Sequence, residues 1–459
     1  MLNYFTFRRI GNDFLIVNLF GQHALVARSE LDALVHDTDL LPEKKKDELE
    51  AKKFILTEND RDDVAALTGL VRKSKSHLFH STGLHILVLT NECNYDCIYC
   101  QAKGTGYANG RMTAEIARKA IDIALCSPER SLSFEFQGGE PLLCFDVLKD
   151  AVEYAESRKS GKELSFSVVS NLSVLTSEMA DYISKRHISV STSLDGPAWL
   201  QNSNRVFHGR DSFQAVEQGL ALLRSKGITV SAIQTTARNS IEHPIEIVDA
   251  YADLGFDQMF IRPLTPLGKA SACWNEIGYT AEEYVEFYRK SIDYLIILNR
   301  KGIRMKEFFS ALLLKRILNM DSGNYMDLRS PCGAGIGQMA YYYNGDVFAC
   351  DEGRMLYEMG DDSWRLGNVF DSEYDDLVGS TRCRSISASS LTETDPICCD
   401  CAYQGLCGIC PIINLSDKTN KLRMFRCKIM SGILDLLFEK IYKGTEEDVS
   451  VLRSWADEK

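Results

Sequence analysis

Between residues 84 and 302 the chain alternates short apolar runs with longer amphipathic stretches. The apolar runs suit buried strands, and the stretches that follow them have apolar positions at helical spacing. The predicted strands are 84–90, 131–137, 164–171, 188–195, 228–237 and 257–264. The predicted helices are 114–125, 141–158, 176–186, 212–227, 243–255 and 282–302.

This repeated strand–helix alternation predicts an α/β fold with a parallel sheet covered by helices, because parallel neighbours require a crossover connection. The pattern fits either an open doubly wound sheet or a partial barrel. In both arrangements ligands bind at the carboxyl ends of the strands. We therefore expect functional residues directly after the predicted strands.

The two ends of the chain follow other patterns. The N-terminal end has short strands and helices that resemble a winged-helix fold, followed by a polar segment, 57–80, interpreted as a linker. Its predicted elements are strands 14–20 and 23–27, with Gly21 at their turn, and helices 29–37 and 42–56, the latter running into a strand. The C-terminal end is rich in Cys, Gly and turn residues and finishes in a predicted helix, 430–444. The predicted domains are 1–80, 81–320 and 321–459.

Composition narrows the class of protein. The 459 residues are 45% hydrophobic and 25% charged, as in soluble globular proteins, and the net charge is −12. An acidic chain is a poor partner for nucleic acid or for an anionic membrane surface. No apolar run reaches the roughly 18 residues that span a bilayer, and MLNYFTFRRIGNDF lacks a signal pattern. We expect a cytoplasmic protein with no nucleic-acid or membrane partner.

Fifteen cysteines in such a chain indicate metal binding or redox chemistry rather than disulfides. Cys126, Cys144 and Cys273 are scattered in apolar or small-residue settings and are interpreted as packing residues. The others fall in two groups, one directly after the first predicted strand and one beyond residue 330. A loop-rich cysteine region of this kind needs metal to hold it together.

The first group is Cys93, Cys97 and Cys100. Three thiolates so close in sequence suit one face of an iron–sulfur cube, which normally takes four cysteine ligands, so one iron is left open to a small molecule. A zinc site needs a fourth protein ligand, and the nearest candidate, His85, lies inside the predicted strand. A zinc site completed from elsewhere in the chain is the alternative.

The next strand ends also carry polar residues. Gly138-Gly139-Glu140-Pro141 follows the second strand, where glycines permit close backbone approach and a carboxylate suits an ammonium group. Ser170 and Asn171 end the third strand, and Ser193 and Asp195 end the fourth. Asp195 equally suits a turn.

The spacing Cys-x3-Cys-x-aromatic-Cys after a first strand resembles the radical S-adenosylmethionine superfamily, and the likeness extends over residues 84–310. It implies a partial (β/α)6 TIM-like barrel, a [4Fe–4S] cluster, S-adenosylmethionine on the open iron, and a 5′-deoxyadenosyl radical. Leu172 departs from the family's pattern, which has Gly after the Asn. The cofactor-binding residues implied by the resemblance are Tyr99, Gly138, Gly139, Glu140, Pro141, Ser170, Asn171, Ser193, Asp195 and Arg205.

The resemblance implies particular roles for three of these residues. Ser193 would bond the ribose or the carboxylate of the cofactor, Arg205 a carboxylate, and Tyr99 would stack on adenine. Packing is the alternative for Tyr99, and an ordinary surface position is the alternative for Arg205.

The second cysteine group resembles the SPASM extension of the same superfamily, which holds two auxiliary [4Fe–4S] clusters and brings the expected total to three. By this resemblance the first auxiliary cluster takes Cys332, Cys350 and Cys410, and the second takes Cys398, Cys401, Cys407 and Cys427. Cys399 is an alternative to Cys398. The first cluster lacks a fourth cysteine, so it has either an open iron or a ligand such as Cys383. A zinc ribbon also fits two Cys-x2-Cys pairs.

The segments from Cys350 and from Cys407 resemble the maturase of the His-Xaa-Ser repeat peptide system. Asp351 stands where related sulfatase maturases have their general base; a turn or salt-bridge role is the alternative. We expect a peptide maturase that captures the leader of a precursor peptide by strand addition and takes electrons from flavodoxin or ferredoxin. The alternatives are a sulfatase-type formylglycine maturase, a non-catalytic electron-transfer protein and a zinc-stabilised binding module.

Overall fold

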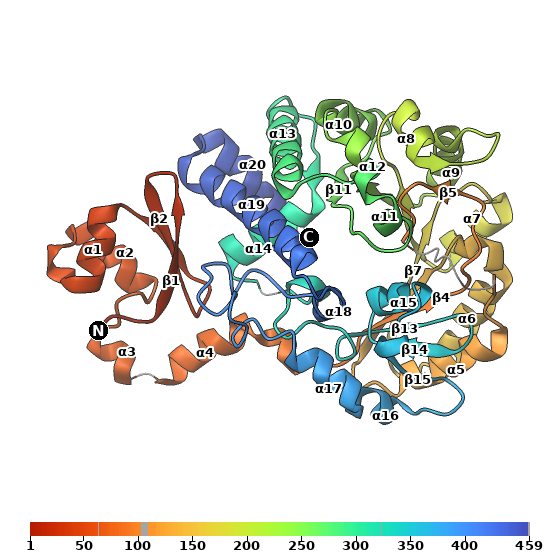
Figure 1. Cartoon of the computed structure of the whole chain (residues 1–459), viewed down its shortest axis with the longest axis horizontal. Helices are drawn as coiled ribbons and strands as arrows, with labels where there is room; N and C mark the ends of the chain where they lie inside the picture. Colours follow the sequence, from red (N-terminus) through yellow and green to blue (C-terminus); the bar gives the residue numbers. More distant parts are fainter. Residues whose placement is uncertain (63, 102–108, 322, 458–459) are drawn as a thin grey trace.

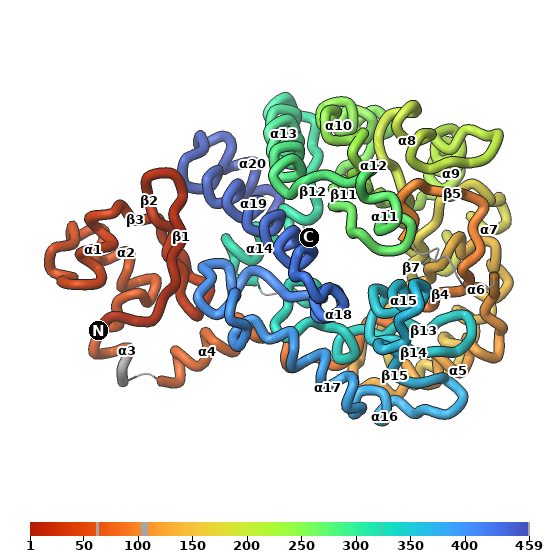
Figure 2. The backbone as a smooth tube through the Cα atoms, in the orientation of Figure 1, coloured from red at the N-terminus to blue at the C-terminus, as the bar shows by residue number. Residues whose placement is uncertain are grey.

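The structure is a computed structural model that describes residues 1–62, 64–101, 109–321 and 323–457. A ten-stranded sheet organises most of the chain (Figures 1 and 2). Its central strands are parallel and correspond to the six predicted from the apolar runs. These strands are β4 (Leu84–Val88), β6 (Ser131–Gln137), β7 (Glu163–Ser170), β8 (Ser189–Ser193), β10 (Val230–Thr235) and β11 (Gln258–Arg262).

The sheet is wider than the sequence predicts because later segments join both edges. The short strand β12 (Lys306–Glu307) pairs in parallel with β11. At the other edge β13 (Gln338–Tyr341) pairs in parallel with β4, and β14 (Asp346–Phe348) and β15 (Arg365–Asn368) continue it antiparallel. The C-terminal cysteine region is therefore anchored directly beside β4, the strand that leads into Cys93.

The helices predicted between the strands are present and cover the outer face of the curved sheet, as Figure 1 shows. Side chains of Thr113, Thr176 and Thr280 cap three of them by accepting backbone hydrogen bonds. The predicted helices are α5 (Ala114–Leu125), α6 (Phe145–Arg158), α7 (Ser177–Lys185), α9 (Ser212–Ser225), α10 (Pro244–Asp253) and α13 (Ala281–Arg300). Four further helices of this region were not predicted from the sequence: α8 (Ala198–Asn204), α11 (Lys269–Ala272), α12 (Trp274–Ile277) and α14 (Phe308–Asn319).

The N-terminal unit is a three-stranded antiparallel sheet with two helices packed on it. The predicted strand pair corresponds to β2 and β3, and β1 precedes them. The segment expected as linker is largely helical because its apolar residues recur at helical spacing. The elements are β1 (Phe5–Ile10), β2 (Asp13–Asn18), β3 (His23–Val26), α1 (Arg28–His36), α2 (Glu43–Ala51), α3 (Glu58–Asp62) and α4 (Val64–Ser74).

The C-terminal region winds between short helices and ends in a helix pair that lies between the N-terminal unit and the barrel (Figure 1). The predicted terminal helix begins earlier than expected, at Lys421. Among the described residues, no helix is sufficiently long and apolar to cross a membrane. The helices are α15 (Asp351–Glu358), α16 (Tyr374–Gly379), α17 (Thr381–Ala388), α18 (Pro411–Ser416), α19 (Lys421–Lys443) and α20 (Glu446–Asp457).

Candidate functional site

The first cysteine loop leaves the carboxyl end of β4 and is fixed by a small antiparallel pairing. Its segment β5 (Asp96–Cys97) pairs with β9 (Arg205–Val206), and the Ile98 amide donates to the Asn204 carbonyl oxygen at 2.9 Å. Burial is the main cause that raises the pKa of the Cys97 thiol to about 12; the neighbouring Cys100 and Cys93 contribute to this rise, and Arg205 opposes it. The structure therefore brings the three predicted thiols together in an environment where a bound cation favours their thiolate forms.

The glycine loop after β6 is pressed against the cysteine loop. The Gly139 amide donates to the Thr90 carbonyl oxygen and the Glu140 amide to the Glu92 carbonyl oxygen, both at 2.8 Å. A Cβ atom on Gly139 would lie 2.1 Å from the Glu92 oxygen, a distance that no side chain tolerates. Because Gly139 lacks a side chain, its backbone can lie directly against the backbone just before Cys93.

Glu140 joins the ends of two neighbouring strands. Its buried carboxylate accepts hydrogen bonds from the Ser170 hydroxyl at 2.7 Å, the Asn171 amide at 2.8 Å and the Leu142 amide at 3.0 Å. Pro141, also buried, begins the short 3-10 turn that follows. The carboxylate therefore holds the end of β7 in place beside the cysteine loop.

The end of β7 reaches the cysteine loop through Asn171. Its side-chain amide donates to the Asn94 side-chain oxygen at 3.0 Å and lies 3.9 Å from the Cys93 sulfur. Leu172, the departure from the glycine pattern, has a left-handed backbone with φ of 62° and a buried side chain. Gly219 on α9 makes room for it, since a Cβ atom there would lie 2.5 Å from that of Leu172.

Asp195, Arg205 and Tyr99 form one buried network after β8. Nε and Nη2 of Arg205 donate to one Asp195 oxygen at 3.1 Å, while the Tyr99 hydroxyl and the Asn204 amide donate to the other. The Arg205 guanidinium also lies 5.4 Å from the centre of the Tyr99 ring. Ser193 is adjacent, and its carbonyl accepts from the Gln201 amide. Asp195 is therefore a buried ion-pair residue, and Arg205 is not on the surface.

A further segment closes over the cysteine loop and was missed in the sequence. Lys269 forms an ion pair with Asp96, and its backbone amide donates to the Cys100 carbonyl oxygen at 3.0 Å. The preceding Gly268 has φ of 55° and leaves no space for a Cβ atom beside that carbonyl. The segment follows β11, so the rule that functional loops follow parallel strands would have found it.

The C-terminal cysteines gather in two sets. The thiols of Cys332 and Cys350 are buried, and each is an electrostatic neighbour of Cys410. The pKa of Cys407 is raised to about 12, chiefly by burial. The neighbouring thiols of Cys398, Cys401 and Cys427 contribute smaller increases. These are the same two sets that the SPASM resemblance assigns to two clusters; their roles as ligands stay predictions.

The two alternative ligands, Cys399 and Cys383, have contacts of their own. The Cys399 thiol donates to the Pro396 carbonyl oxygen at 3.8 Å, and the Cys383 thiol is packed against Gly335. In the described part of the chain, no three His, Cys, Asp or Glu side chains are close enough to surround a single metal ion. An iron–sulfur cube is larger than one ion, so its ligands lie farther apart than those around zinc.

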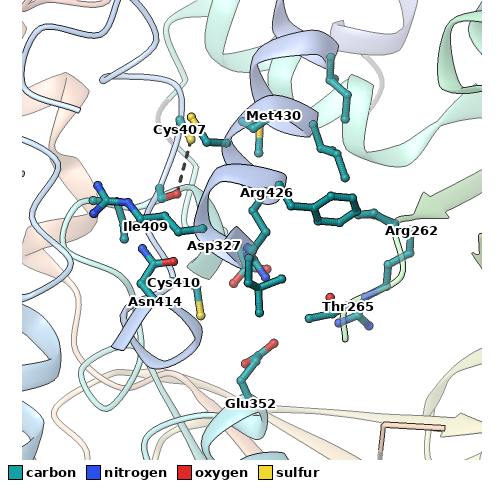
Figure 3. A pocket seen from close by; sticks show the side chains of 18 of the residues that line it. Arg262, Thr265, Asp327, Glu352, Cys407, Ile409, Cys410, Asn414, Arg426 and Met430 are labelled. Carbon is teal, nitrogen blue, oxygen red and sulfur yellow. Dashed lines mark hydrogen bonds between the residues drawn. The ribbon is translucent and has the colours of Figure 1, made fainter. Parts of the chain in front are cut away.

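A cavity of about 240 Å³ extends from the residue that follows the first cysteine group to the C-terminal cysteine region. Its wall includes Gln101, which directly follows Cys100, and Arg262 at the end of β11. Residues of both C-terminal cysteine sets complete the wall. Figure 3 shows Arg262 and Arg426 lining it together with Asp327 and Glu352. Most other wall residues are apolar, so the cavity suits an organic group held between charged side chains.

Asp351 begins α15 and forms an ion pair with Arg354. The guanidinium Nε and Nη2 lie 2.9 and 2.7 Å from one carboxylate oxygen of Asp351, and Arg354 is almost fully buried. The charge of Asp351 also acts on Glu135 of β6, whose pKa is raised chiefly by burial. Asp351 thus faces the barrel, and its carboxylate has the salt bridge that the alternative interpretation expected.

Comparison with known proteins agrees with this geometry. Residues 87–249 match the family model of the Radical SAM superfamily. A cysteine-type anaerobic sulfatase-maturating enzyme of Clostridium perfringens is 24% identical over 362 residues, which cover 76% of this chain and 94% of that enzyme. An uncharacterized protein of Methanothermobacter thermautotrophicus is 30% identical over 202 residues, or 44% of this chain and 74% of that protein.

Two solved structures share the fold. Native anSMEcpe with bound AdoMet has a TM-score of 0.68 at 21% identity and covers 81% of this chain and 99% of its own. Streptococcus suis SuiB bound to S-adenosylmethionine has a TM-score of 0.56 at 15% identity, and the match covers 90% of this chain and 96% of SuiB. Structures of these two proteins also contain the Kp18Cys peptide and the precursor peptide SuiA, respectively. Together, the family match, the relatives and the placement of the three thiols after β4 show that the chain belongs to the radical SAM superfamily of enzymes, which use a [4Fe–4S] cluster and S-adenosylmethionine.

Proposed function

We propose that this enzyme is a radical SAM/SPASM maturase that modifies a side chain or the backbone of a ribosomally made peptide by crosslinking or oxidation. The observation that carries the proposal is the cavity that runs from Gln101 to the C-terminal cysteine sets. A peptide side chain placed there would lie between the first cysteine loop and both auxiliary sets. The peptide-bound structures of similar fold support a peptide as the occupant.

Cys93, Cys97 and Cys100 would hold the first cluster, and the loops at Gly139 and Asn171 would fix the cofactor beside it. Bound S-adenosylmethionine supplies the 5′-deoxyadenosyl radical, which is chemistry of the cofactor rather than of side chains. The chain contributes position and exclusion of water. The hydrogen bonds between the glycine loop and residues 90–92 hold the cysteine loop rigid, and the loop at Lys269 covers it.

We further assign two auxiliary [4Fe–4S] clusters to the C-terminal cysteines, three clusters in all. Cys332, Cys350 and Cys410 would hold the first, and Cys398, Cys401, Cys407 and Cys427 the second. The separation of these thiols into two electrostatically coupled sets supports the assignment. Fifteen free cysteines also suit a cytoplasmic location, where flavodoxin or ferredoxin would supply electrons.

Asp351 is proposed as the residue that accepts a proton from the substrate. It begins α15, its charge acts on Glu135 of β6, and Arg354 holds its carboxylate in an ion pair. This residue also favours a second candidate function, formylglycine formation of the sulfatase-maturating type. The relative from Clostridium perfringens supports that candidate.

The N-terminal unit, residues 1–80, is proposed to bind the leader of the precursor peptide, beside a barrel domain at 81–320 and a cluster domain at 321–459. Within the described residues, β1 and β3 each pair with one strand only, β2. An edge strand can accept an added peptide strand through its free backbone groups. A core peptide without its leader should then react far more slowly than the full precursor; equal rates would contradict the role of this unit.

Iron analysis and turnover test the whole proposal. After anaerobic reconstitution the protein should contain about twelve irons, and a Cys93/Cys97/Cys100→Ala variant about eight. With S-adenosylmethionine and dithionite, the wild-type protein should form 5′-deoxyadenosine and the variant none. Zinc in place of iron, or only about four irons, would contradict the auxiliary clusters. Absence of 5′-deoxyadenosine from the fully loaded protein would favour an electron-transfer role.

A further inference from the structure

The first auxiliary set has three cysteines, although a [4Fe–4S] cluster normally takes four ligands. Cys332 and Cys350 are buried, and Cys410 is half-buried at the wall of the cavity. Two other cysteines lie in this region: the Cys399 thiol donates to the Pro396 carbonyl oxygen, and Cys383 is packed against Gly335 and has Arg384 as its charged neighbour. The fourth ligand is therefore sought among other donors that face the three thiols.

Glu352 is such a donor. It lies on the first turn of α15, two residues after Cys350, and Figure 3 shows it pointing into the cavity that Cys410 also lines. Within the described residues its carboxylate has no ion pair and bonds only its own backbone amide. Its side chain is half-buried at the wall of the cavity. A carboxylate partly removed from water without a partner costs free energy, and coordination to a cation removes that cost.

Asp327 is the competing carboxylate, and the electrostatic neighbours of the thiols separate the two. The charge of Glu352 acts on all three thiols and is the largest charge effect on Cys350, whereas Asp327 acts more strongly than Glu352 on Cys332 and less strongly on Cys410. A fourth ligand has to face all three thiols at once. Arg262 and Arg426 line the same cavity and balance the negative charge that would collect there.

We propose that the Glu352 carboxylate is the fourth protein ligand of the cluster held by Cys332, Cys350 and Cys410. This inference rests on the auxiliary clusters of the proposed function. Carboxylate oxygen is an established ligand of iron in proteins. A cluster closed in this way has no iron free for the peptide, so its role is to carry electrons and not to bind the substrate.

The test uses the full chain with Cys93, Cys97 and Cys100 changed to Ala, so that only the auxiliary clusters remain. Into this background we would introduce Glu352→Ala, Glu352→Cys and, as the matched control, Asp327→Asn. The readouts are iron content and the electron paramagnetic resonance spectrum of the dithionite-reduced protein, with and without cyanide. Cyanide binds an iron only where a protein ligand is missing.

We expect cyanide to change the spectrum of Glu352→Ala alone, and the thiolate of Glu352→Cys to restore the insensitive state. A cyanide response in the parent background would show an open iron and overturn the inference. A response of Asp327→Asn equal to that of Glu352→Ala would assign the position to Asp327 and overturn it too. Fewer than about eight irons in the parent background would instead contradict the auxiliary clusters themselves, and the ligand with them.

Discussion

Individual buried charges do much of the positioning around the first cysteine loop. Asp195 and Arg205 form a buried ion pair near the loop, and the Glu140 carboxylate accepts three hydrogen bonds. Such groups are costly to bury unless their partners are fixed, so each of them holds a strand end in one position. Residue type alone does not reveal this, because the partners lie far apart in sequence.

Glu140 gives a pH prediction. Burial raises the pKa of its carboxyl to about 7 from an ordinary value of 4.5. Between these values the folded protein keeps a proton that the unfolded chain has released, so folding stability falls as the pH rises through this window. The Glu140→Gln side chain does not titrate, so this decrease in folding stability with pH should be absent from the variant. From pH 5.5 to pH 8, wild-type protein should lose about 2 kcal/mol relative to the variant.

The measurement is the thermal unfolding midpoint of both proteins across this pH range under anaerobic conditions. Glu115→Gln, on the exposed side of α5, serves as the control and should track the wild type. Parallel pH curves for wild type and Glu140→Gln would show that Glu140 does not titrate in this window.

At the scale of elements, the site is built by contacts between loops that follow neighbouring strands. The glycine loop after β6 bonds the loop after β4, and the loop after β7 joins both through Asn171 and Glu140. Parallel strands place their carboxyl ends at one edge of the sheet, which is why these loops meet. The sequence order of the strands was sufficient to predict that meeting.

Leu172 and Gly219 provide a test of complementary packing between the β7 loop and α9. Leu172→Gly removes left-handed strain but leaves a cavity, with a net cost of about 1–3 kcal/mol. Gly219→Ala places a Cβ atom 2.5 Å from that of Leu172 and should cost about 1–3 kcal/mol. The double variant should be more stable than the sum of the two effects predicts, because the new methyl group fills space that Leu172 vacated.

Chemical denaturation of the four proteins in this cycle gives the interaction energy. Additive effects within about 0.5 kcal/mol would show that the two positions do not compete for the same space.

At the scale of the whole molecule, the N-terminal unit is attached to the C-terminal helix α19. Arg8 donates two hydrogen bonds of 2.6 Å to Asp435, and its guanidinium lies 5.3 Å from the centre of the Tyr403 ring. Tyr403 follows Cys401 closely and donates to the same Asp435 carboxylate. The proposed leader-binding unit therefore contacts the segment that carries the second C-terminal cysteine set.

Arg8→Ala should loosen this attachment. The pair is partly exposed, so the global stability should fall by only about 0.5–1 kcal/mol. Cleavage by a protease in the segment between the N-terminal unit and the barrel should nevertheless become several-fold faster, because that segment opens when the unit detaches. Arg28→Ala, which breaks an exposed pair with Asp32 inside the N-terminal unit, is the control and should leave cleavage unchanged. Equal cleavage rates for Arg8→Ala and wild type would contradict the attachment.

Much of the barrel was determined by the sequence alone. The periodicity of apolar positions located six parallel strands and the helices between them, because burial on a sheet or on a helix face requires those periods. The spacing of Cys93, Cys97 and Cys100 after the first strand identified the family for the same local reason. The two C-terminal thiol sets were also anticipated by order along the chain, although order does not establish ligation.

Only the tertiary structure decided which distant groups meet. β13 joins the barrel sheet beside β4, Gly219 accommodates Leu172, and Arg205 is buried against Asp195 and Tyr99. Each depends on contacts between segments many residues apart, and no local period or spacing encodes them. The same holds for Glu352, which the sequence places two residues after Cys350, and which the fold places on the wall of the cavity that Cys410 also lines.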